Sequence, residues 1–248
     1  MSTAVLPTPE EPAQYPDAPS TWDNARGHIF MCFARPSSAT EPPPASYHDL
    51  EEKSQFANQT FIGVLQVCVV VRYLESPIGE YDELLWIPGA FENPLSGEQT
   101  YRATRAYVST GVSLYNVREV RIHSVSIRAP SIQSHSSIAY NGKEPFVELD
   151  LEPILFKSRP FLPINTKYLP INFSFDFPPL PQGEEEGLVG TGEWKRVLLE
   201  ISGRAGMVKV KGTTGDGIHY PRLEHGPHWL WVKDARIRIK GAQLPSSE

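Results

Sequence analysis

Hydrophobic and polar residues alternate along much of this chain with the two-residue period of β-strands. The segment 120–128, VRIHSVSIR, alternates over its full length, and segment 229–239 sets Ala235, Ile237 and Ile239 against basic residues. Adjacent residues of a strand face opposite sides of a sheet, so this alternation predicts half-buried strands. Further strands are expected at 28–33, 61–73, 84–87, 101–114, 145–154, 172–177 and 207–211, and a short helix at 47–55.

This succession of strands predicts an all-β protein with minor α-helix. We expect a mostly antiparallel sheet that closes, or nearly closes, on itself and so hides its edges. Residues 1–20 are rich in proline and poor in apolar side chains, which is typical of a disordered or extended tail. We find no repeat or boundary further along and expect residues 21–248 to form a single β domain.

Composition narrows the expected partners and compartment. The net charge of −6 argues against nucleic acid or an anionic membrane as the main partner. Hydrophobic residues make up 40% of the chain, enough for a sizeable core, but no run approaches the roughly 20 apolar residues of a membrane span. With only 2 cysteines the chain is no disulfide scaffold, so we expect a cytoplasmic protein.

The segment 76–89, SPIGEYDELLWIPG, reads as the turn and second strand of a hairpin. Pro77 and Gly79 favour a turn, and an apolar run follows until a second Pro-Gly pair. Asp82 and Glu83 stand where the second strand begins, and only one of the two can point inward. A carboxylate among apolar residues is costly unless it has a partner or a task, so this pair supplies the best site candidate.

This hairpin resembles the acetoacetate decarboxylase-like superfamily, whose members carry a Ser-Pro-[Val/Ile]-Gly-x-Tyr-x-Glu-Leu-Leu segment followed by Pro-Gly. Other segments resemble the family or its fungal-type members, namely 106–109, 114–116, 162–170, 189–195, 202–205 and 229–239. The likeness covers most of residues 60–240. It implies a closed antiparallel barrel or double sheet around an apolar pocket, often in a homo-oligomer. The partners it implies are an apolar small-molecule substrate and further copies of the chain.

The family's chemistry uses a lysine in a Trp-[Gly/Asn]-x-Pro-Lys segment, which forms a Schiff base with a ketone beside a glutamate that corresponds to Glu83. Here the lysine does not match. After Asn116 the chain continues directly as VREVRIH over residues 117–123, and Val120 falls nearest the position of the lysine. The resemblance therefore implies the fold and its pocket without the covalent amine.

The candidate site residues divide into two groups. The catalytic candidates are Glu83, His123 and Arg121; the substrate-binding candidates are Arg72, Tyr81, Trp86, Tyr115 and Arg118. Glu83 is expected to act as an acid, a base or a charge stabiliser. The alternative is a structural carboxylate tied to Arg72 or Arg105, with Asp82 as a cap at the edge of the turn.

His123 could serve as an acid or a base, and Arg121 could hold an anionic or carbonyl oxygen, although a structural histidine and a solvated arginine are the ordinary alternatives. His219, His225 and His228 are irregularly spaced in a Gly- and Pro-rich segment. We interpret them as structural and expect neither a metal nor a cofactor.

Three functions fit this sequence. We favour an enzyme of secondary metabolism that performs lyase, cyclase or isomerase chemistry without a Schiff base, pericyclic cyclisation included, on a polyketide- or terpenoid-like substrate. A pocket can accelerate such steps by holding one reactive conformer. The alternatives are a β-keto acid decarboxylase that uses another lysine, such as Lys167 or Lys195, and a non-catalytic small-molecule carrier.

Overall fold

Strands form over most of the alternating and apolar segments that the computed structural model of the chain describes. It describes residues 18–36, 38–47, 49–52, 54, 57–110, 122–124, 134–139, 145–153, 162–168, 173–179, 181, 192–223, 226 and 228–243. In chain order the elements are β1 (Thr21–Ala34), α1 (Asp49–Glu52), β2 (Phe61–Gly63), β3 (Gln66–Glu75), β4 (Tyr81–Ile87), β5 (Gly89–Glu92), β6 (Gln99–Arg102), β7 (Arg105–Val108), β8 (Ile122–Ser124), β9 (Ser134–Ala139), β10 (Pro145–Pro153), β11 (Leu162–Asn165), the 3-10 helix η1 (Thr166–Tyr168), β12 (Ser174–Phe177), β13 (Lys195–Thr214) and β14 (His228–Gln243).

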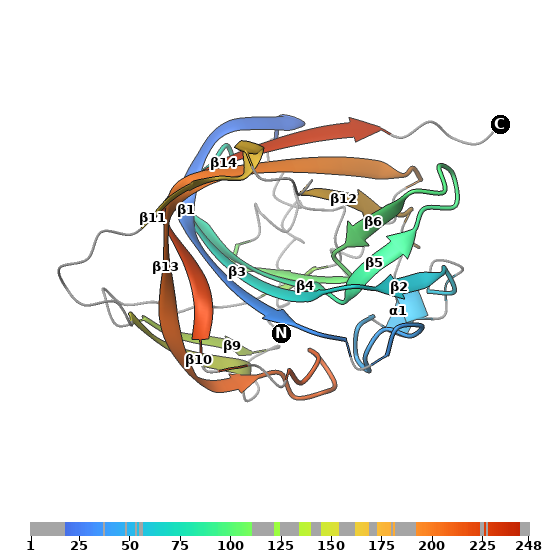
Figure 1. The fold of residues 1–248 in the computed structure, drawn as a ribbon, viewed down its shortest axis with the longest axis horizontal. Coiled ribbons are helices and arrows are strands. Elements are labelled where there is room, and N and C mark those ends of the chain that lie inside the picture. Colours follow the sequence, from blue (N-terminus) through green and yellow to red (C-terminus); the bar gives the residue numbers. More distant parts are fainter. Residues whose placement is uncertain are drawn as a thin grey trace, which may run out of the picture.

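The strands pair in one strongly curled sheet, in the order β2-β5-β6-β12-β13-β14-β1-β3-β4-β7-β8 (Figure 1). Neighbours are antiparallel except for β6 with β12 and β7 with β8. Only Pro88 separates β4 from β5, so the chain itself joins two distant parts of this order and curls the sheet into an open barrel. Its end strands, β2 and β8, do not pair with each other in the described part of the chain. The prediction of an all-β fold with minor helix and a mostly antiparallel sheet is confirmed.

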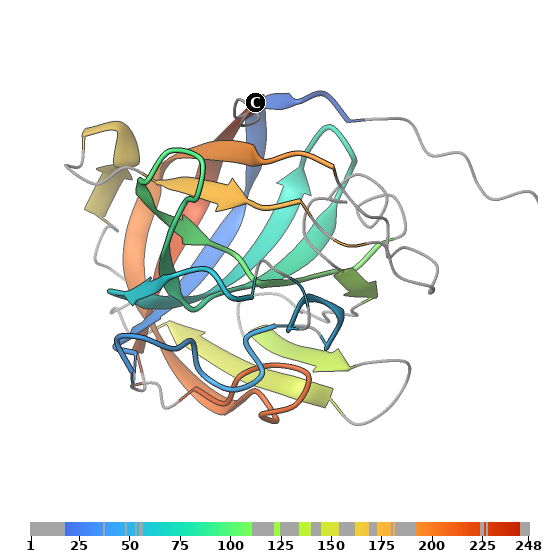
Figure 2. The same cartoon turned by 90° about the vertical axis from the view of Figure 1, so that its right-hand side faces the viewer.

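The long strand β13 connects the barrel to a second layer. Its first half pairs with β12 and β11, its last residues pair with β10, and β14 accompanies it almost throughout. The register with β14 shifts between Ser202 and Arg204, and a bulge of this kind bends a strand and increases its twist. The bend lets β13 leave the barrel wall and carry β9 and β10 against the outside of the barrel (Figure 2).

Alternate residues of the same strands enter two separate cores. In β3, Val69, Val71 and Tyr73 face the inside of the barrel, whereas Cys68 and Val70 face the β9–β10 layer. The buried residues of the inner core are Trp22, Ala25, Ile29, Val69, Val71, Tyr73, Tyr81, Ile87, Ala103, Ala106, Val108, Ile201, Val232, Ala235 and Ile237. Those of the outer core are Phe30, Cys32, Cys68, Val70, Leu84, Trp86, Tyr107, Val147, Leu149, Leu151, Val208, Val210, Tyr220, Leu223 and Trp229.

A buried polar cluster ties the β5–β6 hairpin to β12 and β13. The Asp176 carboxylate accepts hydrogen bonds from Nε and Nη2 of Arg196 at 2.7 and 2.9 Å and from Asn93 Nδ2 at 2.6 Å. Arg196 also lies 2.7 Å from Glu98. Burial alone would raise the pKa of Asp176, but these hydrogen bonds outweigh it and lower the pKa. The cluster therefore holds an ionised carboxylate where β6 pairs with β12.

Several predicted boundaries were wrong. The expected strand 101–114 is broken after Arg102, because its two parts, β6 and β7, pair with β5 and β4 and follow the bend between those strands. The helix expected at 47–55 shrinks to Asp49–Glu52, and the strand expected at 207–211 is one part of β13. Residues 1–17 of the expected tail lie outside the described part of the chain. None of the helices described here is long and apolar enough to cross a membrane.

The bend between β4 and β5 depends on Gly89. Its φ of 153° lies where side chains are strained, and an added Cβ would stand 2.2 Å from the carbonyl oxygen of Gly63. We expect Gly89→Ala to lower the free energy of unfolding in urea by at least about 2 kcal/mol. Gly192→Ala is the control, because its Cβ would meet no atom within 4 Å. Equal stability of the two variants would contradict this account of the bend.

Candidate active site

The hairpin of β3 and β4 sends its two carboxylates to opposite faces of the sheet. Asp82 stands opposite Arg72 in the register, and the guanidinium donates to both of its oxygens, from Nε and from Nη2, at 2.7 Å each. This bidentate geometry is the strong form of an arginine–carboxylate pair. Asp82 is therefore the cross-strand partner of Arg72 and not a turn cap, and Arg72 is not the partner of Glu83.

Glu83 points into the barrel. It is only 6% exposed and stands between Val71 of β3 and Val108 of β7, both inner-core residues. Burial raises the pKa of its carboxyl from 4.5 to about 7, and a hydrogen bond with Tyr73 acts in the opposite direction. Within the described part of the chain, no lysine or arginine contributes to this shift. Glu83 is thus a carboxyl that both gains and loses its proton near neutral pH.

Two stacked phenols stand beside this carboxyl. The rings of Tyr73 and Tyr81 lie 4.4 Å apart and 14° from parallel, and Trp22 meets both edge-on at 6.0 and 6.5 Å. The hydroxyl of Tyr73 hydrogen-bonds both to Tyr81 and to Glu83. Burial, reinforced by the charge of Glu83, raises the pKa of each phenol well above its usual value. Both phenols therefore stay protonated at neutral pH, and Tyr73 can donate to the Glu83 carboxylate and fix its position.

The other predicted site residues lie in different places. Tyr81 belongs to this cluster, whereas Trp86 and Arg72 point to the opposite face of the sheet. Trp86 is fully buried in the outer core, where its Nε1 donates to Ser46 Oγ at 3.1 Å. The site around Glu83 therefore does not include either of them.

The remaining candidates come from the segment that would hold the family's lysine. The backbone of His123 lies on β8, opposite Tyr107 in the parallel register with β7. Tyr115, Arg118 and Arg121 lie outside the described residues. Their assignment to the site remains a prediction.

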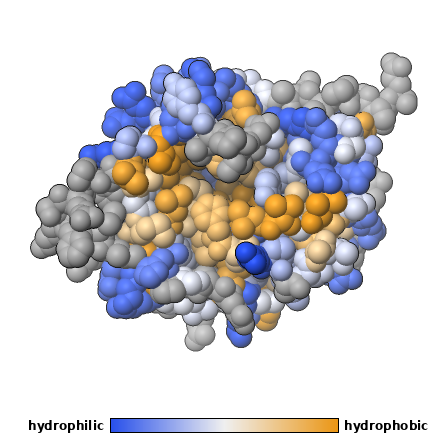
Figure 3. Space-filling view, in the orientation of Figure 1, coloured by the Kyte–Doolittle hydropathy of each residue, from blue (hydrophilic) through white to orange (hydrophobic). Residues whose placement is uncertain are grey.

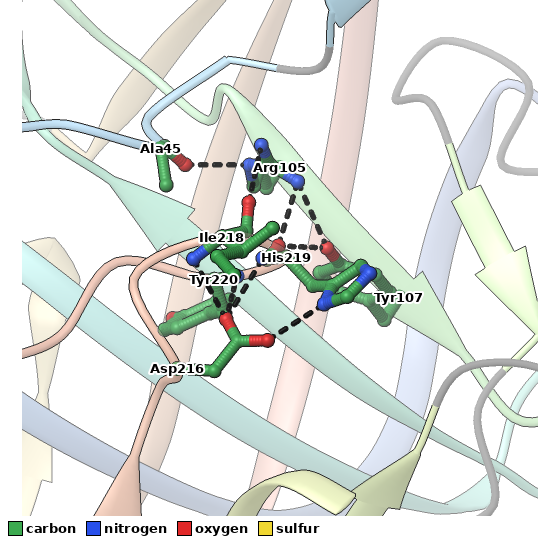
Figure 4. Close-up of polar contacts among 7 residues, drawn as sticks. All are labelled: Ala45, Arg105, Tyr107, Asp216, Ile218, His219 and Tyr220. Atoms are coloured by element: carbon green, nitrogen blue, oxygen red, sulfur yellow. Dashed lines mark hydrogen bonds and ion pairs between the residues drawn. The ribbon is translucent and has the colours of Figure 1, made fainter. Parts of the chain in front are cut away.

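Sequence reasoning did not find the role of Arg105. This buried side chain donates from Nε to the carbonyl oxygen of Ala45 at 2.6 Å, and from Nη1 to that of His219 at 2.6 Å and to the Tyr107 hydroxyl at 3.1 Å (Figure 4). It also bonds to the carbonyl of Tyr47. Arg105 therefore holds two loops against the outer face of β7 and is not the partner of Glu83.

One of these loops is organised by Asp216. Its carboxylate accepts hydrogen bonds from the backbone N–H groups of Ile218 and His219 at 2.8 Å and lies 2.6 Å from Nδ1 of His219 (Figure 4). Burial would raise the pKa of Asp216, but these contacts outweigh it and hold the pKa at about 2. In the described part of the chain, no three potential ligands gather around a metal position. His228 is exposed on β14, and His225 lies outside the described residues.

The two cysteines stand opposite each other in the outer core, Cys32 on β1 and Cys68 on β3. Burial raises the pKa of the Cys32 thiol to about 11 and that of Cys68 further. Both therefore stay protonated at neutral pH, which is unfavourable for a nucleophile.

The buried acid makes stability depend on pH in a defined direction. Folding raises the pKa of Glu83 from 4.5 to about 7, so its folded form binds the proton more tightly than the unfolded chain does. This tighter proton binding stabilises the folded chain. The stabilisation is fully present below pH 4.5 and is lost as the pH rises through about 7. Between pH 4 and pH 8 we expect Glu83 to lower the free energy of unfolding by about 3 kcal/mol.

Urea titrations at several pH values measure this contribution. The Glu83→Gln variant lacks it, so its stability relative to the unmodified chain should rise with pH. Glu92→Gln is the control, because Glu92 is an exposed carboxylate on β5. A stability difference between Glu83→Gln and the unmodified chain that does not change with pH would contradict the burial of an ionising acid.

Comparisons with known proteins agree with this architecture. No protein-family model matches the sequence, and no curated protein shows significant similarity to it. The acetoacetate decarboxylase of Legionella pneumophila has a similar structure, with a TM-score of 0.54 at 11% identity over 97% of this chain and 92% of that one. The enduracididine biosynthesis enzyme MppR, solved with pyruvate, gives 0.51 at 13% identity over 96% and 95% of the two chains.

An acetoacetate decarboxylase-like enzyme of Sphingomonas wittichii also has a TM-score of 0.51, at 15% identity, with 91% of this chain and 94% of that one covered. In each comparison nearly the whole of both chains is included, so the likeness extends over the full barrel and not over one hairpin. The chain therefore has the acetoacetate decarboxylase-like fold.

Proposed function

We propose that this chain is an enzyme that uses Glu83 as a general acid–base catalyst on an apolar substrate, without forming a Schiff base. The observation that carries the proposal is a carboxyl buried inside the barrel, with a pKa near 7 and no described lysine or arginine acting on it. Burying a carboxylate with no described cation beside it opposes folding, and strongly shifted carboxyls are characteristic of catalytic sites.

The expected chemistry follows from the pKa and the surroundings. An acid–base catalyst is most effective when its pKa lies near the working pH, because both of its forms are then present. The Glu83 carboxylate takes a proton from a carbon next to a carbonyl or alkene, and the acid formed returns that proton to another atom of the substrate. Tyr73 keeps the carboxylate oriented through its hydrogen bond. The result is an isomerisation, a cyclisation or a dehydration.

The inner core suits an apolar substrate. Among the described residues, Glu83 shares the inner core with aliphatic and aromatic side chains such as Val71, Val108 and Trp22. Such walls hold a flexible apolar molecule in one conformer, which favours ring closure, pericyclic cyclisation included. These apolar walls support an apolar substrate, and the class we propose is a polyketide- or terpenoid-like compound of fungal-type secondary metabolism.

Exchange of hydrogen for deuterium tests the acid–base step without the natural substrate. In D2O near pH 7 we expect the protein to accelerate deuterium uptake next to the carbonyl of 2-decanone, measured by mass spectrometry. Glu83→Gln should reduce the protein-dependent rate at least about a hundredfold, the usual contribution of such a catalyst. Glu92→Gln should leave the rate unchanged. Exchange that persists in Glu83→Gln would remove Glu83 from the mechanism, and ketone binding without exchange would favour a carrier.

The alternative use of a lysine has a separate test. Lys167 is exposed in η1, and Lys195 lies at the first residue of β13, so neither is described in contact with Glu83. We expect no mass increment when the protein is incubated with acetoacetate and borohydride and its intact mass is measured. A Schiff-base decarboxylase of the family serves as the positive control. A mass increase equal to one reduced imine would contradict the proposal and indicate Schiff-base chemistry at a lysine.

A further inference from the structure

The inner face of the sheet continues beyond Glu83 as a row of apolar side chains. Residues that stand opposite one another on neighbouring strands form rows across a sheet. The row of Glu83 passes through Val71, Ile29 and Val232. The next row lies two residues along each strand and therefore on the same face. Its members, from β4 to β13, are Leu85, Val69, Met31, Leu230 and Met207, which we call the Leu85–Met207 row.

The row is most accessible at the end that lies farthest from Glu83. Val69 is 9% exposed, and the half-buried Leu85 and Met31 pack against the inner core. Met207, at the far end, is 39% exposed. Figure 3 shows apolar atoms gathered across the middle of the face seen in Figure 1, over β3, β4 and β5. The row thus runs from beside the buried acid toward solvent.

We propose that the Leu85–Met207 row binds an extended apolar arm of the substrate whose reacting end lies over Glu83. This inference rests on the proposed function and specifies its substrate class. All five side chains are uncharged, so the row offers nothing to a polar arm. Two are methionines, whose flexible, polarizable side chains adapt to varied apolar ligands.

The length of the row sets the size of the arm. Four strand-to-strand intervals separate Leu85 from Met207, and at about 4.8 Å each they span about 19 Å. A keto acid of a few carbons would occupy only the end near Glu83. The row therefore favours a substrate with a long chain or several fused apolar units. Continuity of this row with the row of Glu83 identifies the occupant as part of the substrate.

Binding of a ketone series tests the row without any turnover. The probes are linear 2-alkanones of increasing length, which displace the fluorescent apolar dye N-phenyl-1-naphthylamine. Affinity should rise up to about fourfold for each added methylene, the fold-change that corresponds to about 0.8 kcal/mol per buried methylene, and level off once the chain outgrows the row. An affinity that does not depend on chain length would overturn the proposal.

Charges placed at two points of the row locate the arm. Met207→Asp should lower the affinity for the longest ketones alone, at least tenfold. Met31→Asp should also lower the affinity for ketones of intermediate length. Met31→Gln keeps the side-chain volume and replaces the aspartate variant if that one fails to fold. It should weaken the binding of the same ketones, those of intermediate length and the longest. Leu74→Asp is the matched control: Leu74 is 42% exposed but belongs to the opposite face of β3, and its variant should bind the series normally.

The remaining outcomes separate this inference from the proposed function. Equal weakening by Leu74→Asp, or by every row variant at all lengths, would overturn the inference. So would a change in molecular mass by light scattering in Met207→Asp with unaltered ketone binding, because the row would then be a contact between copies of the chain. Glu83→Gln should bind the series normally but lose deuterium exchange. If the unmodified chain binds ketones according to their length but does not accelerate deuterium exchange, the inference about the row is supported and the proposed catalysis is contradicted.

Discussion

The antiparallel register of β13, β14, β1, β3 and β4 is the constraint on which this molecule depends. It decides for each residue whether the side chain enters the barrel or the outer core. At the start of β4 it places Asp82 outside, where Arg72 binds it, and Glu83 inside, where no described cation reaches it. A slip of one residue would exchange the two acids and all the apolar side chains with them. The candidate site and the two cores are therefore consequences of a single pairing.

Keeping Glu83 in the inner core opposes folding at neutral pH. The unfavourable contribution of about 3 kcal/mol is a large part of the roughly 5–15 kcal/mol by which proteins of this kind are stable. Tyr73 reduces it, because its hydroxyl stabilises the carboxylate, and Tyr81 supports Tyr73 by stacking on its ring. The hydrogen bond from Tyr73 thus favours the charged form and partly offsets the burial that raises the pKa of Glu83 to about 7. A pKa near neutral pH is compatible with the proton transfer proposed for Glu83.

Strand alternation was enough to predict the hairpin, the separation of Asp82 from Glu83 and the all-β fold. The same alternation places Trp86 on the face opposite Glu83, because the two residues are three positions apart, so the sequence alone argued against assigning Trp86 to the site. The partners of Arg105 were not predictable, since they are backbone carbonyls 60 and 114 positions away in the chain. The full length of β13 was hidden as well, because Gly203, Gly206 and Gly212 interrupt its apolar pattern. Choices of partner over long sequence separations follow from packing, which no local pattern records.

The contacts of Arg105 have a mechanical consequence for the wall behind the site. One guanidinium holds the carbonyl oxygens of two loops that are far apart in sequence, and Tyr220, from the second loop, donates its hydroxyl to the carbonyl of Leu85 on β4. Both loops are therefore anchored to the same side chain, each through hydrogen bonds of its own. Hydrogen bonds from side chains therefore fasten two loops to the outer faces of β4 and β7, behind the strand positions that carry Glu83 and Val108.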